Sequence, residues 1–196
     1  NIAYVQLYNF YERAPFLFNR AAVGILLQQA DGMILDLRNN PGGFLNAAVN
    51  IAGWFLENGK LVVTEEFRPG AGEAEEFEAY GNGLLKDKPV VILINAGSAS
   101  ASEILAGTLR DHRGIKLVGD KSFGKGTVQE LLELSGDAMA KVTVAHWRLP
   151  GGNLIEENGL EPDVEVSLTD EDIENDKDPQ LEMAIEVLKR ELGIAN

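Results

Sequence analysis

The stretch PVVILIN, residues 89–95, runs directly into AGSASASEIL, residues 96–105. The first part is a continuous apolar run rich in β-branched residues, which is typical of a strand buried on both faces of a parallel sheet. The second part begins as a turn of small residues and continues as a helix, predicted over residues 102–112. This succession of strand, tight turn and helix is typical of α/β domains.

The rest of the chain repeats this alternation. The spacing of apolar residues predicts further strands and helices. Two of the predicted strands, residues 61–67 and 75–80, should form a hairpin around Pro69-Gly70. The order predicts an α/β fold with a mainly parallel central sheet, to which a small β-hairpin and a C-terminal helix are appended. The predicted strands are 2–10, 33–37, 61–67, 75–80, 115–118, 127–134 and 140–147, and the further helices are 16–30, 44–56 and 179–192.

The C-terminal end has a different composition. Residues 169–178 are acidic and are predicted to be a solvated linker before the last helix. We therefore expect a core over residues 1–168, and a segment 169–196 whose helix packs on the core or on a partner. A strand pattern follows Asn1 at once, so we expect the start of the chain to be a cut within a larger protein.

The composition excludes several classes of function. A formal charge of −14 argues against a nucleic-acid partner, because phosphate binding needs clustered Lys and Arg. The absence of cysteine excludes disulfides, a thiol nucleophile and thiolate metal sites. No apolar run reaches the ~20 residues that cross a bilayer, and no signal-peptide pattern opens the chain. We expect no cofactor.

The small-residue turn places hydroxyl groups at a helix N-terminus. Free backbone N–H groups and the helix dipole favour developing negative charge there, which suits a nucleophile such as Ser100. The pattern Ser100-x-x-Glu103 is also a capping box, which is a purely structural device. Ser98 and Ser102 compete with Ser100 for either role. The turn alone leaves nucleophile and cap both open.

A second candidate loop carries Lys125 between two glycines, in the sequence SFGKGTVQ of residues 122–129. Apolar neighbours such as Phe123 could desolvate the ammonium, lower its pKa and make it a general base. Gln129 lies four residues on and could hold the amine by a hydrogen bond. A solvent-exposed turn is the alternative interpretation. A phosphate loop is not supported, because the Walker spacing is absent.

A third candidate turn is DLRNNPGG, residues 36–43, which leads from a predicted strand into a predicted helix. Backbone N–H groups at such a turn suit an oxyanion hole, although an ordinary strand-to-helix connection has the same pattern. Asp36 and Arg38 are better suited to an ion pair than to catalysis. His112, about 15 Å along its helix from Ser100, and His146 do not support histidine catalysis. No ligand spacing indicates a metal site.

Taken together, DLRNNPGG, GSASASE and SFGKGTVQ resemble the motifs of the carboxyl-terminal processing peptidases, or tail-specific proteases, and they occur in that family's order. The late GLEPDV, residues 159–164, resembles a further family signature. The resemblance implies a crotonase-like core of β-β-α units and protein C-terminal tails as substrates, bound as extended strands. It implies these roles: nucleophile Ser100, general base Lys125, lysine-orienting Gln129, and oxyanion-hole donors Ala101 and Gly43, with Gly42 as the neighbouring candidate.

Members of this family usually carry a PDZ domain, for which residues 1–30 have no room, so we expect a catalytic core without one. The resemblance further implies an extracytoplasmic location in a bacterial periplasm or cell envelope. A homo-oligomer and a separate PDZ domain or adaptor stay open as partners. Two other functions remain as alternatives, a noncatalytic ligand- or peptide-binding module and a crotonase-type acyl-CoA enzyme.

Overall fold

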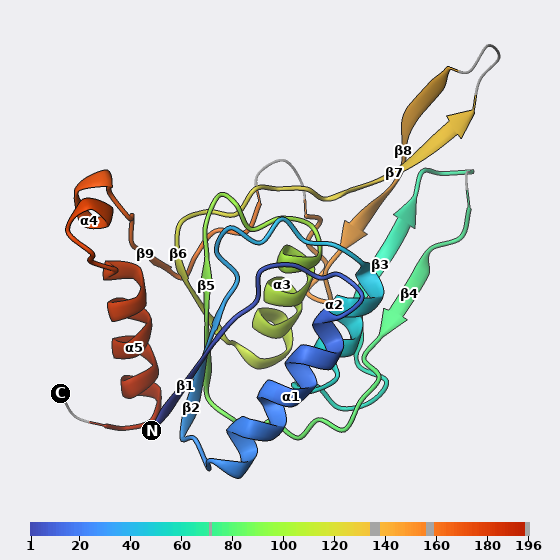
Figure 1. Cartoon of the computed structure of the whole chain (residues 1–196). Helices are drawn as coiled ribbons and strands as arrows, with labels where there is room; N and C mark the ends of the chain where they lie inside the picture. Colours follow the sequence, from blue (N-terminus) through green and yellow to red (C-terminus); the bar gives the residue numbers. More distant parts are fainter. Residues whose placement is uncertain (71, 134–137, 156–158, 195–196) are drawn as a thin grey trace.

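The computed structural model describes residues 1–70, 72–133, 138–155 and 159–194 (Figure 1). Its main sheet is entirely parallel and has the strand order β1-β2-β5-β6-β9. The strands are β1 Ile2–Gln6, β2 Gly32–Asp36, β5 Val90–Ile94, β6 Lys116–Gly119 and β9 Val164–Glu165. The predicted α/β fold with a mainly parallel sheet is confirmed, and β9 is a strand that the sequence patterns did not reveal.

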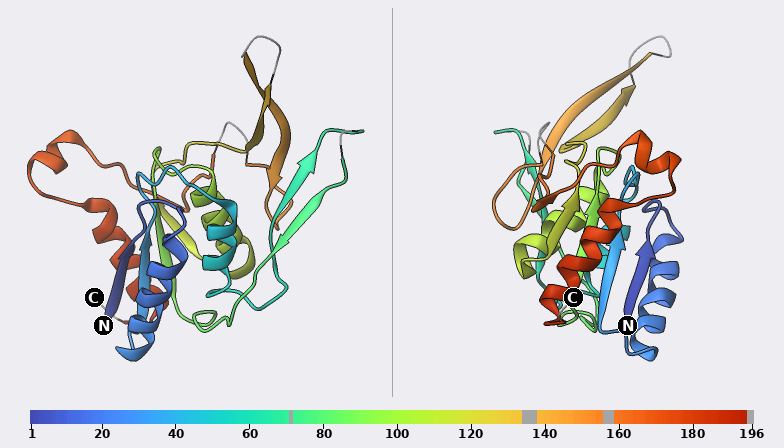
Figure 2. Two further views of the ribbon diagram at one scale, coloured as in Figure 1. Left: turned by 45° about the vertical axis from the view of Figure 1, so that its right-hand side comes forward. Right: turned by 90° about the vertical axis from the view of Figure 1, so that its left-hand side faces the viewer.

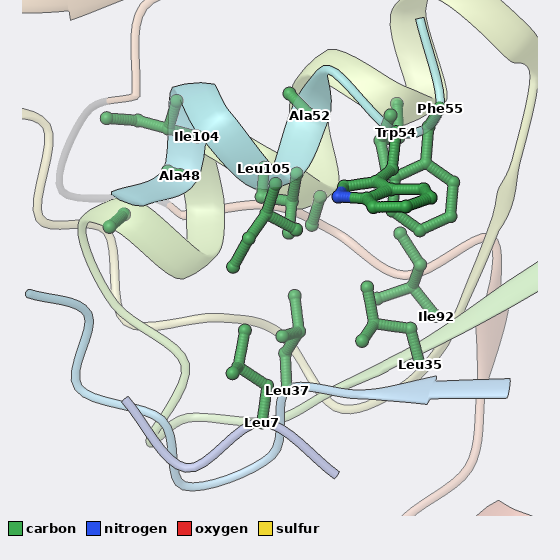
Figure 3. Close-up of a cluster of buried hydrophobic side chains, with 14 of the residues drawn as sticks. Leu7, Leu35, Leu37, Ala48, Ala52, Trp54, Phe55, Ile92, Ile104 and Leu105 are labelled. Atoms are coloured by element: carbon green, nitrogen blue, oxygen red, sulfur yellow. The ribbon is translucent and has the colours of Figure 1, made fainter. Parts of the chain in front are cut away.

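The central strands are buried on both faces, which explains their continuous apolar sequences. In β5, Ile92 faces one hydrophobic core while Val91 and Leu93 face another. The larger core lies between the sheet and helices α1 Ala14–Leu27, α2 Leu45–Ala52 and α3 Ala101–Arg113. Figure 3 shows its centre, where Leu35 and Ile92 of the sheet approach side chains from α2, α3 and the segment after α2. Each such side chain contributes about 1.5–3 kcal/mol of burial free energy.

Helix α5, Pro179–Glu191, covers the opposite face of the sheet, as both views in Figure 2 show. Its buried residues Ala184 and Leu188 pack with Ile34, Val91 and Leu93 in the second core. The acidic segment before it was expected to be a linker, but it contains the short helix α4, Asp170–Glu174, capped by Thr169. Within the described residues, no helix is long and apolar enough to span a membrane.

A second, antiparallel sheet has the order β4-β3-β8-β7. The predicted hairpin of β3 Leu61–Phe67 and β4 Glu75–Glu78 is confirmed. It is not an isolated appendage, because β3 also pairs with β8 Met139–Arg148, which forms a projecting hairpin with β7 Thr127–Glu133 (Figure 1). Sequence patterns show strands but not which distant strands pair, so this sheet could not be assembled from them.

Three connections leave the carboxyl ends of the neighbouring strands β2, β5 and β6. We name them the glycine turn (residues 37–44), the serine turn (residues 95–100) and the lysine loop (residues 120–126). Because parallel strands point the same way, the three connections meet at one edge of the sheet, which is where open α/β sheets bind ligands. The predicted strand 2–10 ends early at Gln6, and Phe10 instead forms an isolated bridge with Gly43 in the glycine turn.

Candidate active site

Two of the three serines near the serine turn have structural roles. The Ser98 hydroxyl donates to the Leu37 carbonyl (2.8 Å) and accepts from the Asn95 N–H (3.0 Å). The Ser102 hydroxyl donates to the Asn40 carbonyl (2.9 Å). Both side chains are fully buried. These hydroxyl groups fix the serine turn and the start of α3 to the glycine turn, so neither competes with Ser100 as a nucleophile.

Ser100 differs from both. It is half-buried at the N-cap of α3. Its backbone has φ 56° and ψ −117°, a conformation that residues other than glycine rarely adopt. Its N–H donates to Glu103 Oε2 (2.8 Å), and its side chain lies at the Glu103 N–H, so both contacts of the predicted capping box are present. The contact between its hydroxyl and the Glu103 N–H does not meet full hydrogen-bond geometry, so the hydroxyl is held only weakly. A strained serine at a strand-turn-helix junction, with a hydroxyl that makes no full hydrogen bond, is an arrangement used by nucleophilic serines.

Glu103 joins the serine turn to the lysine loop. Its carboxylate is completely buried and accepts four hydrogen bonds. Oε2 accepts from the N–H of Ser100 (2.8 Å) and of Lys125 (2.9 Å). Oε1 accepts from the Ser122 hydroxyl (2.6 Å) and the Gly124 N–H (2.7 Å). The sequence indicated Glu103 only as a cap, because nothing in the local pattern reveals a contact with a loop about twenty residues away.

The lysine loop is held by its backbone. Besides the bonds to Glu103, the Phe123 N–H donates to the Ser98 carbonyl (3.0 Å). Gly126 passes so close to Ile155 that a Cβ would overlap the Ile155 carbonyl, so only glycine fits there. The prediction that Phe123 and its neighbours bury the Lys125 ammonium is wrong for this structure, since the side chains of both residues are exposed. The backbone bonds point inward and leave these side chains to solvent.

Gln129 does not contact Lys125 in this arrangement. It lies in β7 directly after a break in the strand register between Val128 and Gln129, so the simple spacing argument does not apply. Its side chain is exposed. Among the residues that the structure describes, no hydrogen bond joins the Lys125 amine to Ser100 or to Gln129. The lysine loop is thus held in place by its backbone, and the Lys125 side chain is exposed to solvent.

The hydrogen bonds of the glycine turn distinguish Gly42 from Gly43 as candidate oxyanion-hole donors. The Gly42 N–H already donates to Asn40 Oδ1 (3.0 Å), so it is not available as an oxyanion-hole donor. Gly42 instead packs on the serine turn, where a Cβ would lie 2.6 Å from the Ala99 carbonyl oxygen and 2.9 Å from Ser100 Cβ. Within the described part of the chain, the N–H groups of Gly43 and Ala101 have no acceptor. These two groups remain as the candidate donors.

The start of the glycine turn is fixed by an ionic network. Arg38 pairs with the buried Asp36 (2.7 Å) and with Asp178 at the N-terminus of α5 (2.8 Å), which confirms the predicted structural ion pair. Burial favours a higher pKa for Asp178, but the hydrogen bonds and charge of Arg38 outweigh it and hold this pKa below its ordinary value. Burial and a hydrogen bond to Asp36 raise the pKa of Tyr4 to about 12.

The two histidines lie in other surroundings. His112 lies in the last turn of α3, where its ring nitrogen Nε2 contacts the Leu61 carbonyl (2.6 Å), and His146 lies within β8, opposite Thr127 of β7.

An apolar cavity of about 740 Å³ adjoins the glycine turn between β1 and α1. Phe18 and Leu7 form buried parts of its wall, and the exposed rings of Tyr8, Tyr11 and Phe44 surround it.

Comparison with known proteins agrees with this geometry. The sequence matches the model of peptidase family S41 over residues 1–166. A carboxyl-terminal-processing protease of Synechocystis is 40% identical over 199 residues, which cover 100% of this chain and 46% of that protein. The carboxy-terminal processing protease CtpA of Bacillus subtilis is 35% identical over 170 residues, with coverage of 87% and 36%.

A solved structure with a similar fold is that of a photosystem II D1 C-terminal processing protease. It is 35% identical with a TM-score of 0.77, over 85% of this chain and 42% of that one. The chain spans less than half the length of each of these relatives. Because the family model matches most of the chain and the three candidate motifs meet at one edge of the sheet, the chain belongs to peptidase family S41.

Proposed function

We propose that this chain carries the active site of a serine endopeptidase that cleaves protein C-terminal tails, with Ser100 as nucleophile and Lys125 as general base. The observation that carries the proposal is the state of Ser100. Its backbone is strained, its hydroxyl makes no full hydrogen bond, and the N–H of Ala101, which has no acceptor in the described part of the chain, follows it at the N-terminus of α3. Membership of a peptidase family supports the same reaction.

In the first half of the reaction, the neutral Lys125 amine takes the hydroxyl proton as Ser100 Oγ attacks the peptide carbonyl carbon. The N–H groups of Ala101 and Gly43 bind the oxygen, which becomes negative as the tetrahedral intermediate forms. Collapse of the intermediate breaks the C–N bond, and the Lys125 ammonium gives its proton to the leaving amine. Water then attacks the ester with Lys125 again as base, which releases the new carboxylate and restores Ser100.

Lys125 must turn inward for this chemistry. The anchored backbone leaves its flexible four-carbon side chain free to rotate, and we propose that this rotation alone brings the amine to Ser100. Gln129 would hold the amine after that rotation. Substrate binding would provide the desolvation that favours the neutral amine, because a peptide lying over the site excludes water from it.

The apolar cavity beside the glycine turn suits a substrate side chain. Phe44 lines this cavity and directly follows Gly43, the proposed oxyanion donor. A carbonyl bound at Gly43 therefore brings a neighbouring substrate residue against the aromatic rim of Tyr11 and Phe44, whose rings lie 6.3 Å apart in edge-to-face orientation. We propose that an apolar residue next to the scissile bond occupies this cavity.

The setting of the enzyme is proposed from the family resemblance. We propose an extracytoplasmic location, in a bacterial periplasm or cell envelope. We also propose a catalytic core over residues 1–168, and a C-terminal segment over residues 169–196. The packing of α5 on the sheet supports an attachment of that segment to the core rather than to a partner.

The proposal is tested by hydrolysis of internally quenched peptides with apolar residues around the cleaved bond. Ser100→Ala and Lys125→Ala should each abolish cleavage while circular dichroism and Tm stay near those of the wild type. Lys121→Ala is the matched control, since it removes an exposed lysine of the same loop that pairs with Glu161. Undiminished cleavage by Ser100→Ala or Lys125→Ala would contradict the assignment of that residue.

A further inference from the structure

Gln180, in the first turn of α5, is a buried polar residue with a full set of partners. Its side chain is 1% exposed. Its Oε1 accepts from the Arg38 guanidinium (3.0 Å), and its Nε2 donates to Asp120 Oδ2 (2.7 Å) and to the Val166 carbonyl (2.7 Å). Such a fully bonded buried amide fixes the relative position of the groups that it bridges.

The two side chains bound to Gln180 begin two of the three connections at the candidate active site. Arg38 follows β2 and stands at the start of the glycine turn, four residues before Gly42. Asp120 follows β6 as the first residue of the lysine loop, and its N–H donates to the Ile94 carbonyl (3.1 Å). Because β5 lies between β2 and β6, Gln180 spans the end of the strand that leads to Ser100.

This bridge lies on the face of the sheet opposite the bond made by Glu103. Glu103 joins the serine turn to the lysine loop from α3, and its hydrogen bonds do not reach the glycine turn. Gln180 joins the glycine turn directly to the lysine loop from α5. Asp178 strengthens this attachment, because it binds the same Arg38 and accepts from the Leu181 N–H (2.9 Å) at the start of α5.

We propose that Gln180 is a positioning residue for the reaction, which sets the spacing between the glycine turn with its oxyanion donor and the lysine loop with its base. The inference rests on the proposed function. A serine peptidase needs donor, nucleophile and base aligned within a fraction of an ångström, so a small shift between two supporting loops lowers the rate of acylation. Binding of the substrate tail depends less on this spacing.

The test uses the substitution Gln180→Glu, which keeps the size of the side chain and an acceptor for Arg38. It removes the donor to Asp120 and to the Val166 carbonyl, and it sets two carboxylates against each other. We expect kcat, and the rate at which a fluorophosphonate labels Ser100, to fall at least tenfold with little change in KM. Adding Asp120→Asn lets the new amide at position 120 donate to the new carboxylate at position 180 and removes the repulsion between the two carboxylates, although the Val166 carbonyl still lacks its donor. The double variant should therefore recover part of the lost rate.

Leu188→Ala is the control for stability, because Leu188 is fully buried in the core under α5 but bonds to neither loop. It should lower Tm while leaving kcat and labelling unchanged at temperatures below unfolding. A Gln180→Glu enzyme with wild-type kcat and labelling, or a loss of rate that Asp120→Asn does not reduce, would overturn the positioning role. A wild-type chain that is not labelled at Ser100 would instead overturn the proposed function, and with it this inference.

Discussion

The backbone N–H groups of Ser100 and Lys125 donate to one and the same carboxylate oxygen, Oε2 of Glu103, at 2.8 and 2.9 Å. The two residues are 25 positions apart in the sequence, and this shared acceptor brings their backbones together. The site is therefore organised through main-chain contacts, and the side chains of Ser100 and Lys125 carry no structural hydrogen bonds in the described residues. That division leaves both side chains available for chemistry.

Glu103→Gln should damage both stability and activity. Whichever way the amide is oriented, its NH₂ group faces two hydrogen-bond donors, either Ser100 and Lys125 or Ser122 and Gly124. We expect a loss of about 2–4 kcal/mol in the free energy of unfolding, because buried donors lose a charged acceptor. Urea denaturation measures it, with the exposed Glu130→Gln as control. Equal stability and full activity would refute the coupling role of Glu103.

Gly42→Ala should abolish activity because the new methyl group meets the serine turn. Gly42 has φ 93°, and its Cβ would lie 2.6 Å from a carbonyl oxygen. Gly152→Ala is a matched control, with φ 86° and no atom within 4 Å of the added Cβ. The control should lose about 1–2 kcal/mol of stability from backbone strain alone. Peptidase activity and the free energy of unfolding, measured for both variants, separate the effect of backbone strain from that of the contact with the serine turn. Similar activities of the two variants would contradict the close packing of Gly42 on the serine turn.

Tyr4→Phe should remove a tyrosine ionisation that occurs at a higher pH than that of an ordinary tyrosine. Burial and the hydrogen bond to Asp36 raise the pKa of Tyr4 to about 12 from an ordinary value of 10.0. Between these values the folded chain holds a proton that the unfolded chain has released, so this contribution to stability is lost as pH rises from about 10 to 12. Absorbance at alkaline pH follows the phenolate. An unchanged titration curve in Tyr4→Phe would be inconsistent with the buried hydrogen bond.

Phe44→Ala should weaken binding of substrates with an apolar residue beside the cleaved bond. Loss of the ring opens the cavity rim next to Gly43, so we expect KM for such peptides to rise about tenfold, equivalent to about 1.4 kcal/mol of lost contact. Peptides with a polar residue at that position should be affected less. Leu27→Ala, at a 79% exposed position near the end of α1, is the control. An equal effect on both peptide classes would argue against the cavity as a subsite.

Much of the fold could be predicted from the sequence because its signals are local. The apolar runs of β2 and β5 are continuous since both faces of these strands are buried, and each is followed by a turn rich in small residues. Parallel strands place those turns at the same edge of the sheet. The structure adds that β2, β5 and β6 are neighbours, which brings the three motifs together.

What could not be predicted depends on contacts between distant segments. The choice between Gly42 and Gly43 is decided by a hydrogen bond from Gly42 to the Asn40 side chain, which the sequence does not reveal. The exposure of Lys125 follows from the inward direction of its backbone N–H, whereas apolar composition nearby suggested burial. The bridge made by Gln180 joins α5 to loops 60 and 142 residues earlier in the chain.

The most direct test of the account is the site of covalent modification by a fluorophosphonate, measured by intact mass and peptide mapping of the whole chain. We predict one adduct on Ser100 in the wild type, and none in Lys125→Ala, because the serine is activated only when the amine accepts its proton. A Lys121→Ala chain should be labelled like the wild type. Labelling of Ser98 or Ser102, or undiminished labelling of Ser100 in Lys125→Ala, would contradict the proposed Ser–Lys chemistry.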